Sequence, residues 1–162
     1  MKSVWGDIMS LTYGKAEKKD FRRINELFVE MLQTIYQTDQ VKGYAEGALD
    51  RFFEGGEEWI SIAMDNDRIV AFLSIEVHRE EKEFIYLDDF SVTKQYRGKG
   101  IGSSMMRIAE SYAKEIHIPA ICLHVEKSNA AALRLYERLG YQVYEDQGSR
   151  YCMIKKVLEM HF

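Results

Sequence analysis

The sequence predicts an α/β (α+β) fold, in which a mixed central β-sheet of six to seven strands is flanked by four helices. The 162 residues fit one domain of the usual ~100–200 residues, and no repeat or proline-rich linker divides residues 1–162. A strand, a helix and a strand follow one another in the second half, which implies a parallel pair with a right-handed crossover. Short turns between the other β-rich runs imply antiparallel pairing, so the sheet is expected to be mixed.

The first half of the chain is expected to hold a short strand and two helices. The strand is placed near residues 8–13. A helix is predicted over 21–35, with Asp20 in an N-cap-like position, and a second, shorter helix over 45–55, ended by Gly55 and Gly56. Apolar residues at helical spacing mark the first helix: Phe21, Ile24, Leu27, Phe28, Met31, Leu32 and Ile35.

The middle of the chain is expected to form three strands and a long helix. Two β-rich runs within 58–80 are joined at Asp65-Asn66-Asp67, a turn sequence typical of a hairpin. The next strand covers 83–93. One apolar stripe predicts a long helix that ends before Pro119: Ile101, Met105, Ile108, Tyr112 and Ile116.

The chain is expected to end in a strand, a helix and two further strands. The strand at 120–127 is of the buried type. Ser128 or Asn129 can cap the helix that follows, and Gly140 is suited to end it. The runs 141–146 and 151–158 are expected to pair in antiparallel fashion.

Composition and charge exclude several classes of protein. The net charge of −4 disfavours a sequence-independent nucleic-acid binder, which needs a basic face. No apolar run is long enough for a secretory segment or a membrane span, so we expect a cytoplasmic protein without a membrane partner. Cys122 and Cys152 lack metal-ligand spacing, and we expect two core thiols and no metal.

A basic, glycine-rich turn follows the strand at 83–93. Glycines at 98, 100 and 102 let the backbone approach a ligand closely, and the helix that begins there offers unpaired N–H groups and a positive dipole end. Lys94, Arg97 and Lys99 add positive charge, so a small phosphorylated ligand is expected. The spacing matches neither the P-loop nor the Rossmann fingerprint.

The sequence "QYRGKGIG" resembles the Q/R-x-x-G-x-G/A acetyl-CoA signature of the GNAT N-acetyltransferase superfamily, with Gln95, Gly98 and Gly100 at the defining positions. Downstream, "HVEKSNAAALRLYERLGY" resembles the second half of that family's cofactor-binding region. The resemblance implies a GNAT-like fold and acetyl-CoA as co-substrate.

The resemblance also implies roles for individual residues. Backbone N–H groups of residues 97–103 would hold the pyrophosphate, and the main chain of residues 90–92 would pair with the pantetheine arm. Asn129 would help to hold the cofactor, and Tyr136, seven residues on and on the same helix face, would protonate the leaving thiolate. Packing alone is the other interpretation of Tyr136. The implied cofactor set is Phe90, Ser91, Val92, Gln95, Arg97, Gly98, Lys99, Gly100, Ile101, Gly102, Ser103, Asn129 and Tyr136.

Two adjacent aspartates, Asp88 and Asp89, precede the glycine turn. An amine must lose a proton before it attacks a thioester, and a carboxylate can take that proton, directly or through a water. Neighbours on a strand face opposite sides unless a bulge intervenes. "YLDDFSV" resembles the polyamine acetyltransferases of the family, where the first acidic residue is a water-linked base, which implies Asp88. The other interpretations are that the two aspartates cap the strand or attract a cationic substrate. Glu76 on the preceding strand is the second candidate base.

The acceptor site is expected in residues 36–59, where acidic and aromatic side chains favour a cation. They are Tyr44, Glu46, Phe52, Phe53, Glu54, Glu57 and Glu58, and none is assigned as a ligand. The expected activity is transfer of acetyl to a small primary amine or polyamine by direct attack in a ternary complex. A protein amino terminus or lysine is the second acceptor class, an antibiotic the third. A non-catalytic acyl-CoA sensor is the alternative of another class. A homodimer through the last two strands is expected by analogy.

Overall fold

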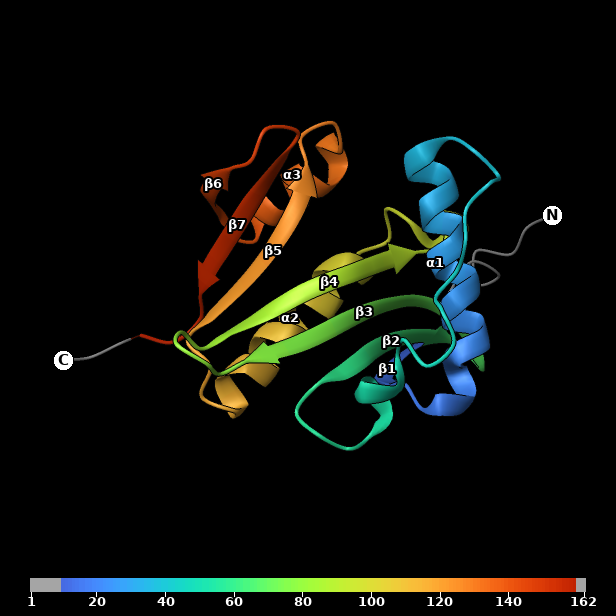
Figure 1. Ribbon diagram of the computed structural model, residues 1–162, viewed down its shortest axis with the longest axis horizontal. Coiled ribbons are helices and arrows are strands. Elements are labelled where there is room, and N and C mark those ends of the chain that lie inside the picture. Colours follow the sequence, from blue (N-terminus) through green and yellow to red (C-terminus); the bar gives the residue numbers. More distant parts are fainter. Residues whose placement is uncertain (1–9, 160–162) are drawn as a thin grey trace.

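The structure is a computed structural model that describes residues 10–159. Its seven-stranded sheet has the order β1-β2-β3-β4-β5-β7-β6 (Figure 1). The elements are β1 (Leu11–Lys15), α1 (Phe21–Tyr36), β2 (Trp59–Asp65), β3 (Arg68–His78), β4 (Phe84–Val92), α2 (Ile101–Glu115), β5 (Ala120–Glu126), α3 (Ala130–Arg138), β6 (Gln142–Asp146) and β7 (Arg150–Lys156). Single 3₁₀ turns lie at Lys18–Asp20, Asp50–Phe53 and Lys94–Tyr96. The predicted α/β class is confirmed.

The sheet is mixed, as the sequence predicts. β4 and β5 run parallel, joined by the α2 crossover, and every other neighbouring pair is antiparallel. The β2–β3 hairpin turns at Asn66, whose φ of 55° is one that asparagine tolerates better than most residues. The last two strands pair as expected, and Gly140 has a φ of 95° just beyond α3.

The predicted second helix over 45–55 is wrong, so three α-helices and not four flank the sheet in the described part of the chain. Gly47 has a φ of 79°, which interrupts any helix at that point, and only the 3₁₀ turn Asp50–Phe53 forms. Phe52 from this turn is buried, so tertiary packing shapes the segment. The predicted first strand starts later, at Leu11, and residues 8 and 9 of that prediction lie outside the described residues.

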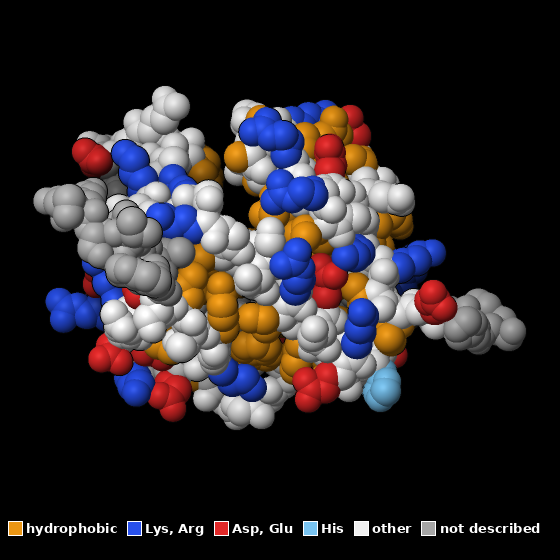
Figure 2. All heavy atoms as spheres, turned by 180° about the vertical axis from the view of Figure 1, so that it is seen from behind, with side chains coloured by type: hydrophobic (Ala, Val, Ile, Leu, Met, Phe, Trp, Pro, Cys, Tyr) orange, Lys and Arg blue, Asp and Glu red, His pale blue; other side chains and the backbone are white. Residues whose placement is uncertain are grey.

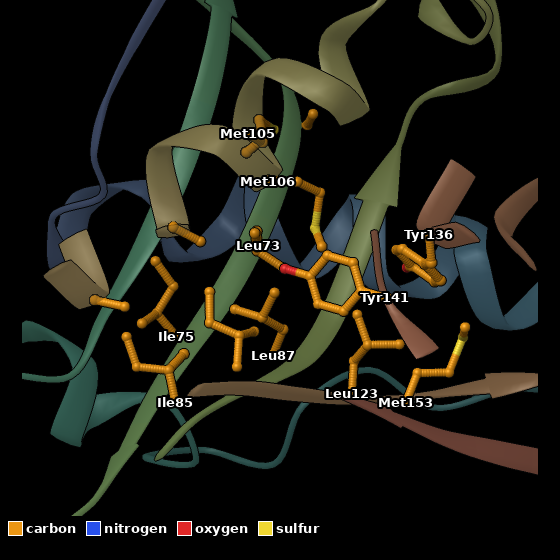
Figure 3. Packing of buried hydrophobic residues seen from close by; sticks show 14 of the residues in the cluster. Leu73, Ile75, Ile85, Leu87, Met105, Met106, Leu123, Tyr136, Tyr141 and Met153 are labelled. Atoms are coloured by element: carbon orange, nitrogen blue, oxygen red, sulfur yellow. The ribbon is translucent and has the colours of Figure 1, made fainter. Parts of the chain in front are cut away.

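Helices cover both faces of the sheet, and each face has its own core. α1 covers one face, where Ile24 and Leu27 pack with Phe72 of β3. α2 and α3 cover the other, where Met105 and Met106 pack with residues of β3, β4 and β5 (Figure 3). Because β3 is buried on both sides, its sequence is a nearly continuous apolar run. The two layers enclose β3 and β4 between them, and β4 carries the predicted site.

Candidate active site

The parallel strands β4 and β5 separate at the end of a short paired stretch. Their pairing covers only Ile85, Tyr86 and Leu87 opposite residues 121–123. β4 continues to Val92 along β3, and β5 continues to Glu126 along β7 (Figure 1). Residues 88–92 therefore have no strand partner on the β5 side. Figure 2 shows a notch in the upper edge of the surface between the part with α1 and the part with α3, β6 and β7.

A β-bulge lies where the strands separate. Leu73 pairs with Phe90 and Ile75 pairs with Leu87, so that Asp88 and Asp89 both stand opposite one residue of β3. The two aspartates therefore escape the strict alternation of a regular strand. The bulge brings both carboxylates among groups from β3 and from the segment after α1.

The carboxylates of the bulge differ in their surroundings. Asp88 is exposed and interacts with Glu76 of β3, whereas Asp89 is half-buried and its Oδ2 accepts a hydrogen bond of 2.6 Å from the Tyr44 hydroxyl. Burial raises the pKa of Asp89, and the charge of Asp88 raises it further. The hydrogen bond from Tyr44 acts in the opposite direction and lowers this pKa.

Glu76 connects the bulge to the 3₁₀ turn at Asp50–Phe53. Its side chain is 13% exposed, and burial is the main reason why its pKa is raised. The Arg51 guanidinium, 3.4 Å from Glu76 Oε1, opposes that rise, and the charge of Asp88 strengthens it. Arg51 also lies 3.6 Å from Glu58 Oε1. Arg51 thus contacts two carboxylates, and His78 Nε2 lies 3.6 Å from Glu76 Oε1. With Asp88 interacting with Glu76, this acidic group favours a cationic ligand.

Tyr86 and His124 form a polar pair that the sequence interpretation missed. Their side chains share a hydrogen bond of 2.7 Å between the phenol oxygen and Nδ1 across the two separating strands. Burial, with Arg150 nearby, lowers the pKa of His124, and burial raises the pKa of Tyr86 to about 12, so both are neutral near pH 7. Asp88 influences the pKa of both, and the pair therefore adjoins the predicted base.

The glycine turn leads from β4 into the start of α2. Gly98 and Gly100 have φ values of 74° and 83°. The first i to i−4 bond of the helix joins the Ser104 N–H to the Gly100 carbonyl, so the N–H groups just before it have no intrahelical partner. Such groups are suited to a pyrophosphate. Two features therefore fit acetyl-CoA: this turn suits the pyrophosphate, and the open strand edge of residues 88–92 suits the pantetheine arm.

Side chains of the predicted cofactor set have distinct surroundings in this turn. Gln95 and Lys99 are exposed, and Arg97 Nε donates to the Val92 carbonyl at 2.8 Å. Ile101 is buried and anchors α2. A Cβ on Gly102 would lie 3.2 Å from the Leu135 side chain, so this glycine lets α2 and α3 approach each other.

Asn129 and Tyr136 lie at the start and near the end of α3. Asn129 Oδ1 accepts a hydrogen bond from the Ala132 N–H at 3.2 Å and is therefore the N-cap. Tyr136 is buried beside Tyr141 on the α3 side of the core (Figure 3). Burial raises its pKa to about 12, which keeps the phenol protonated. Within residues 10–159 its hydroxyl has no hydrogen-bond partner, so it remains available to a ligand.

The predicted acceptor segment reaches the bulge at two points. Tyr44 binds Asp89, and Glu58 joins Arg51 and accepts a hydrogen bond from the Val77 N–H at 3.0 Å. Glu57 instead pairs with Arg79, and Phe52 is buried. The segment therefore contributes through two of its seven predicted side chains.

Other groups of the described chain stand apart from this chemistry. The thiols of Cys122 and Cys152 are free, with 3.4 Å between their Sγ atoms, and burial raises the pKa of Cys122 to about 12. Within residues 10–159, no three His, Cys, Asp or Glu side chains are grouped as metal ligands would be. None of the described helices is both long and apolar enough to cross a membrane.

Replacement of Gly100 by alanine is expected to weaken acetyl-CoA binding about tenfold, because an alanine at positive φ costs ~1–2 kcal/mol and the turn must keep this shape to present its N–H groups. Isothermal titration calorimetry measures the change. Gly148→Ala is the matched control, since Gly148 has a φ of 88° in the β6–β7 turn and also has open space around it. Equal weakening by both variants would contradict the role of the glycine turn.

Comparison with known proteins points to a family of acetyltransferases. The model of a family described as "Acetyltransferase (GNAT) family" matches residues 20–141. N-alpha-acetyltransferase 30 of Schizosaccharomyces pombe is 29% identical over 113 residues, 68% of this chain and 75% of that protein. A probable spermine N(1)-acetyltransferase of Bacillus subtilis subsp. natto is 36% identical over 59 residues, 36% of this chain and 39% of that protein.

Among solved structures, the PaiA N-acetyltransferase from Thermoplasma acidophilum in complex with coenzyme A has the same fold. Its TM-score is 0.75 at 19% sequence identity, and the match covers 91% of this chain and 99% of that one. The two proteins therefore share an overall fold.

Proposed function

This chain belongs to the acetyltransferase (GNAT) family, and we propose that it acetylates a small primary amine, polyamines included. Membership makes it an acetyl-CoA-dependent N-acetyltransferase, with acetyl-CoA as co-substrate. The non-catalytic acyl-CoA sensor that the sequence alone left open is therefore not proposed.

The gathering of carboxylates at the bulge supports a cationic acceptor. Asp88 interacts with both Asp89 and Glu76, and Arg51 contacts both Glu76 and Glu58. These four carboxylates outnumber the basic groups beside them, Arg51 and His78, so the site attracts a protonated amine before it reacts. The likeness to a probable spermine N(1)-acetyltransferase over 59 residues agrees with this choice.

In the proposed reaction, Asp88 relieves the acceptor of its proton. Its carboxylate is exposed in the described chain, so that a water or the ammonium itself can reach it. Such a positioned base contributes on the order of 10²–10⁴ in rate. The neutral Tyr86–His124 pair adjoins Asp88 and offers the proton a route along the strand ends.

The remaining groups act on the acetyl donor. Backbone N–H groups of residues 97–103 hold the pyrophosphate, and the main chain of residues 90–92 binds the pantetheine amides as an added strand would. The backbone N–H near Val92 polarises the thioester carbonyl. Tyr136, protonated because it is buried, donates its proton to the departing thiolate. The amine attacks directly, since no cysteine in or beside the turn offers an acyl-enzyme.

A peptide amino terminus is the second candidate acceptor. N-alpha-acetyltransferase 30, a relative that covers 68% of this chain, carries that activity in its name. An amino terminus is also a primary amine with a positive charge, which the same carboxylates would attract. The two classes differ in size, because a peptide needs a surface beyond the bulge for its side chains.

A panel of acceptors tests the proposed function. We expect small amines and polyamines to release free CoA from acetyl-CoA at rates well above those of a set of amino-terminal peptides, as measured by a thiol-reactive dye. Mass spectrometry of each mixture confirms the acetylated amine. Faster release with any peptide than with every small amine would favour the second candidate. A cytoplasmic location and a homodimer through β6 and β7 remain predictions, which fractionation and light scattering check.

A further inference from the structure

We propose that Tyr44 is a positioning residue that holds Asp89 away from the reaction, so that Asp88 alone exchanges protons with the acceptor. This inference rests on the proposed function, because it assumes Asp88 as the base. It assigns different tasks to two adjacent aspartates that the sequence does not distinguish. Three observations support it: Tyr44 is anchored on α1, its hydroxyl contacts Asp89, and both aspartates lie on the bulge.

Tyr44 is fixed by three contacts, two with α1 and one with β4. Its backbone N–H donates to Asn25 Oδ1 at 2.7 Å, and its ring stacks on Phe28 with 3.9 Å between centroids and 15° between planes. Both partners belong to α1. A Cβ on the preceding Gly43 would lie 2.3 Å from Asn25 Oδ1, so the chain passes α1 as closely as a glycine permits. The phenol is thereby held in one place.

The third contact joins this anchor to the bulge. The Tyr44 hydroxyl donates to Asp89 Oδ2 at 2.6 Å, a short hydrogen bond to a charged group. Burial and the two aspartates keep the pKa of Tyr44 well above its usual value, so the phenol remains a donor at every working pH. Asp89 accepts from Tyr44, whereas Asp88 interacts with Glu76 and is exposed, so that an acceptor can reach it.

Without the phenol, the two aspartates would compete for one proton. Burial and Asp88 both raise the pKa of Asp89, and the Tyr44 hydrogen bond is what opposes them. The charged and titratable groups around the two aspartates are Tyr44, Glu76, Tyr86 and His124. Arg51 and His78 lie beside Glu76, and Arg150 acts on Tyr86 and His124. A protonated Asp89 would donate to Asp88 and make that carboxylate a weaker base. Loss of the phenol is therefore expected to harm the reaction most at low pH.

Carboxyl-carbon NMR titration of Asp89 tests the contact directly and requires no turnover. In Tyr44→Phe we expect the Asp89 midpoint to rise by about one pH unit, as for the loss of a hydrogen bond to a charged group. Tyr96→Phe is the matched control. The Tyr96 hydroxyl donates to Asp65 Oδ2 in a hydrogen bond of the same length, 2.6 Å, and this bond lies outside the bulge. It is expected to leave the Asp89 midpoint unchanged. An unchanged midpoint in Tyr44→Phe would overturn the proposal.

The pH dependence of the rate tests the consequence. In Tyr44→Phe we expect the acidic limb of kcat to move to higher pH, with recovery on the alkaline side and little change in KM for acetyl-CoA. In an Asp89→Asn background, the same Tyr44→Phe change is expected to move the limb no further. If the limb moves equally in that background, Tyr44 does not act through Asp89 and the proposal is wrong. If the small-amine proposal fails, peptides and not small amines will drive thiol release, while the shift of the Asp89 midpoint in Tyr44→Phe is still observed. The two proposals can therefore fail independently.

Discussion

Tyr136→Phe is expected to lower kcat about 10²–10⁴-fold, the usual contribution of a general acid. The phenol is buried and its pKa is raised to about 12, so it is protonated whenever a thiolate needs a proton. Because the hydroxyl has no partner within residues 10–159, its removal leaves no group unsatisfied, and the melting temperature is expected to stay the same or rise. Thiol release with a responsive amine measures kcat, and calorimetry measures acetyl-CoA binding.

Tyr141→Phe is the control for this experiment. Tyr141 is also buried and meets the Tyr136 ring edge to face, with 6.0 Å between centroids, but its hydroxyl donates to Glu110 of α2. Its loss is expected to affect stability more than the rate. Thiol release from Tyr136→Phe at the unchanged rate, with acetyl-CoA binding intact, would show that Tyr136 only packs.

Asp88→Asn is expected to have the second large effect, a loss of about 10²–10⁴ in kcat near neutral pH. The loss should shrink as pH rises toward the amine's own pKa of ~10.4, since the acceptor then loses its proton to water. A pH profile of kcat between neutral and alkaline pH shows whether the two enzymes converge.

Glu76→Gln separates the two candidate bases. Glu76 is nearly enclosed, at 13% side-chain exposure, and interacts with both Arg51 and Asp88. We expect this variant mainly to raise KM for the acceptor, because it removes one charge from the group of carboxylates. A larger loss of kcat from Glu76→Gln than from Asp88→Asn, with convergence at alkaline pH, would make Glu76 the base.

Most of the fold follows from local patterns in the sequence. The Asp65-Asn66-Asp67 turn, the apolar stripe of α2 and the cap at Asn129 each predict an element that the structure contains. The helix predicted over 45–55 fails because its apolar residues pack by tertiary contact: Phe52 is buried from a single 3₁₀ turn, while Gly47 takes a left-handed conformation. Short segments with glycines are the ones in which such contacts override helical spacing.

The candidate site is predictable where it depends on the backbone and less so where it depends on side chains from distant segments. The glycine turn is a local motif, and its positive φ angles follow from its glycines. Tyr44 and Asp89 are 45 residues apart, and Tyr86 and His124 are 38 apart. Tyr86 stands two residues before Asp88, and His124 of β5 lies one residue beyond the stretch that pairs with β4. This pair could therefore be predicted once β4 and β5 are taken as neighbours. The Tyr44 contact depends on how a loop folds over α1 and has no comparable signal.

The direct-transfer account is tested most directly by initial rates measured while acetyl-CoA and the amine are varied together. Attack within a ternary complex predicts double-reciprocal lines that converge, and intact-protein mass spectrometry after mixing with acetyl-CoA alone should show no acetylated enzyme. Parallel lines, together with an acetylated enzyme that delivers its acetyl group to the amine, would contradict the account and place a nucleophile of the chain between donor and acceptor.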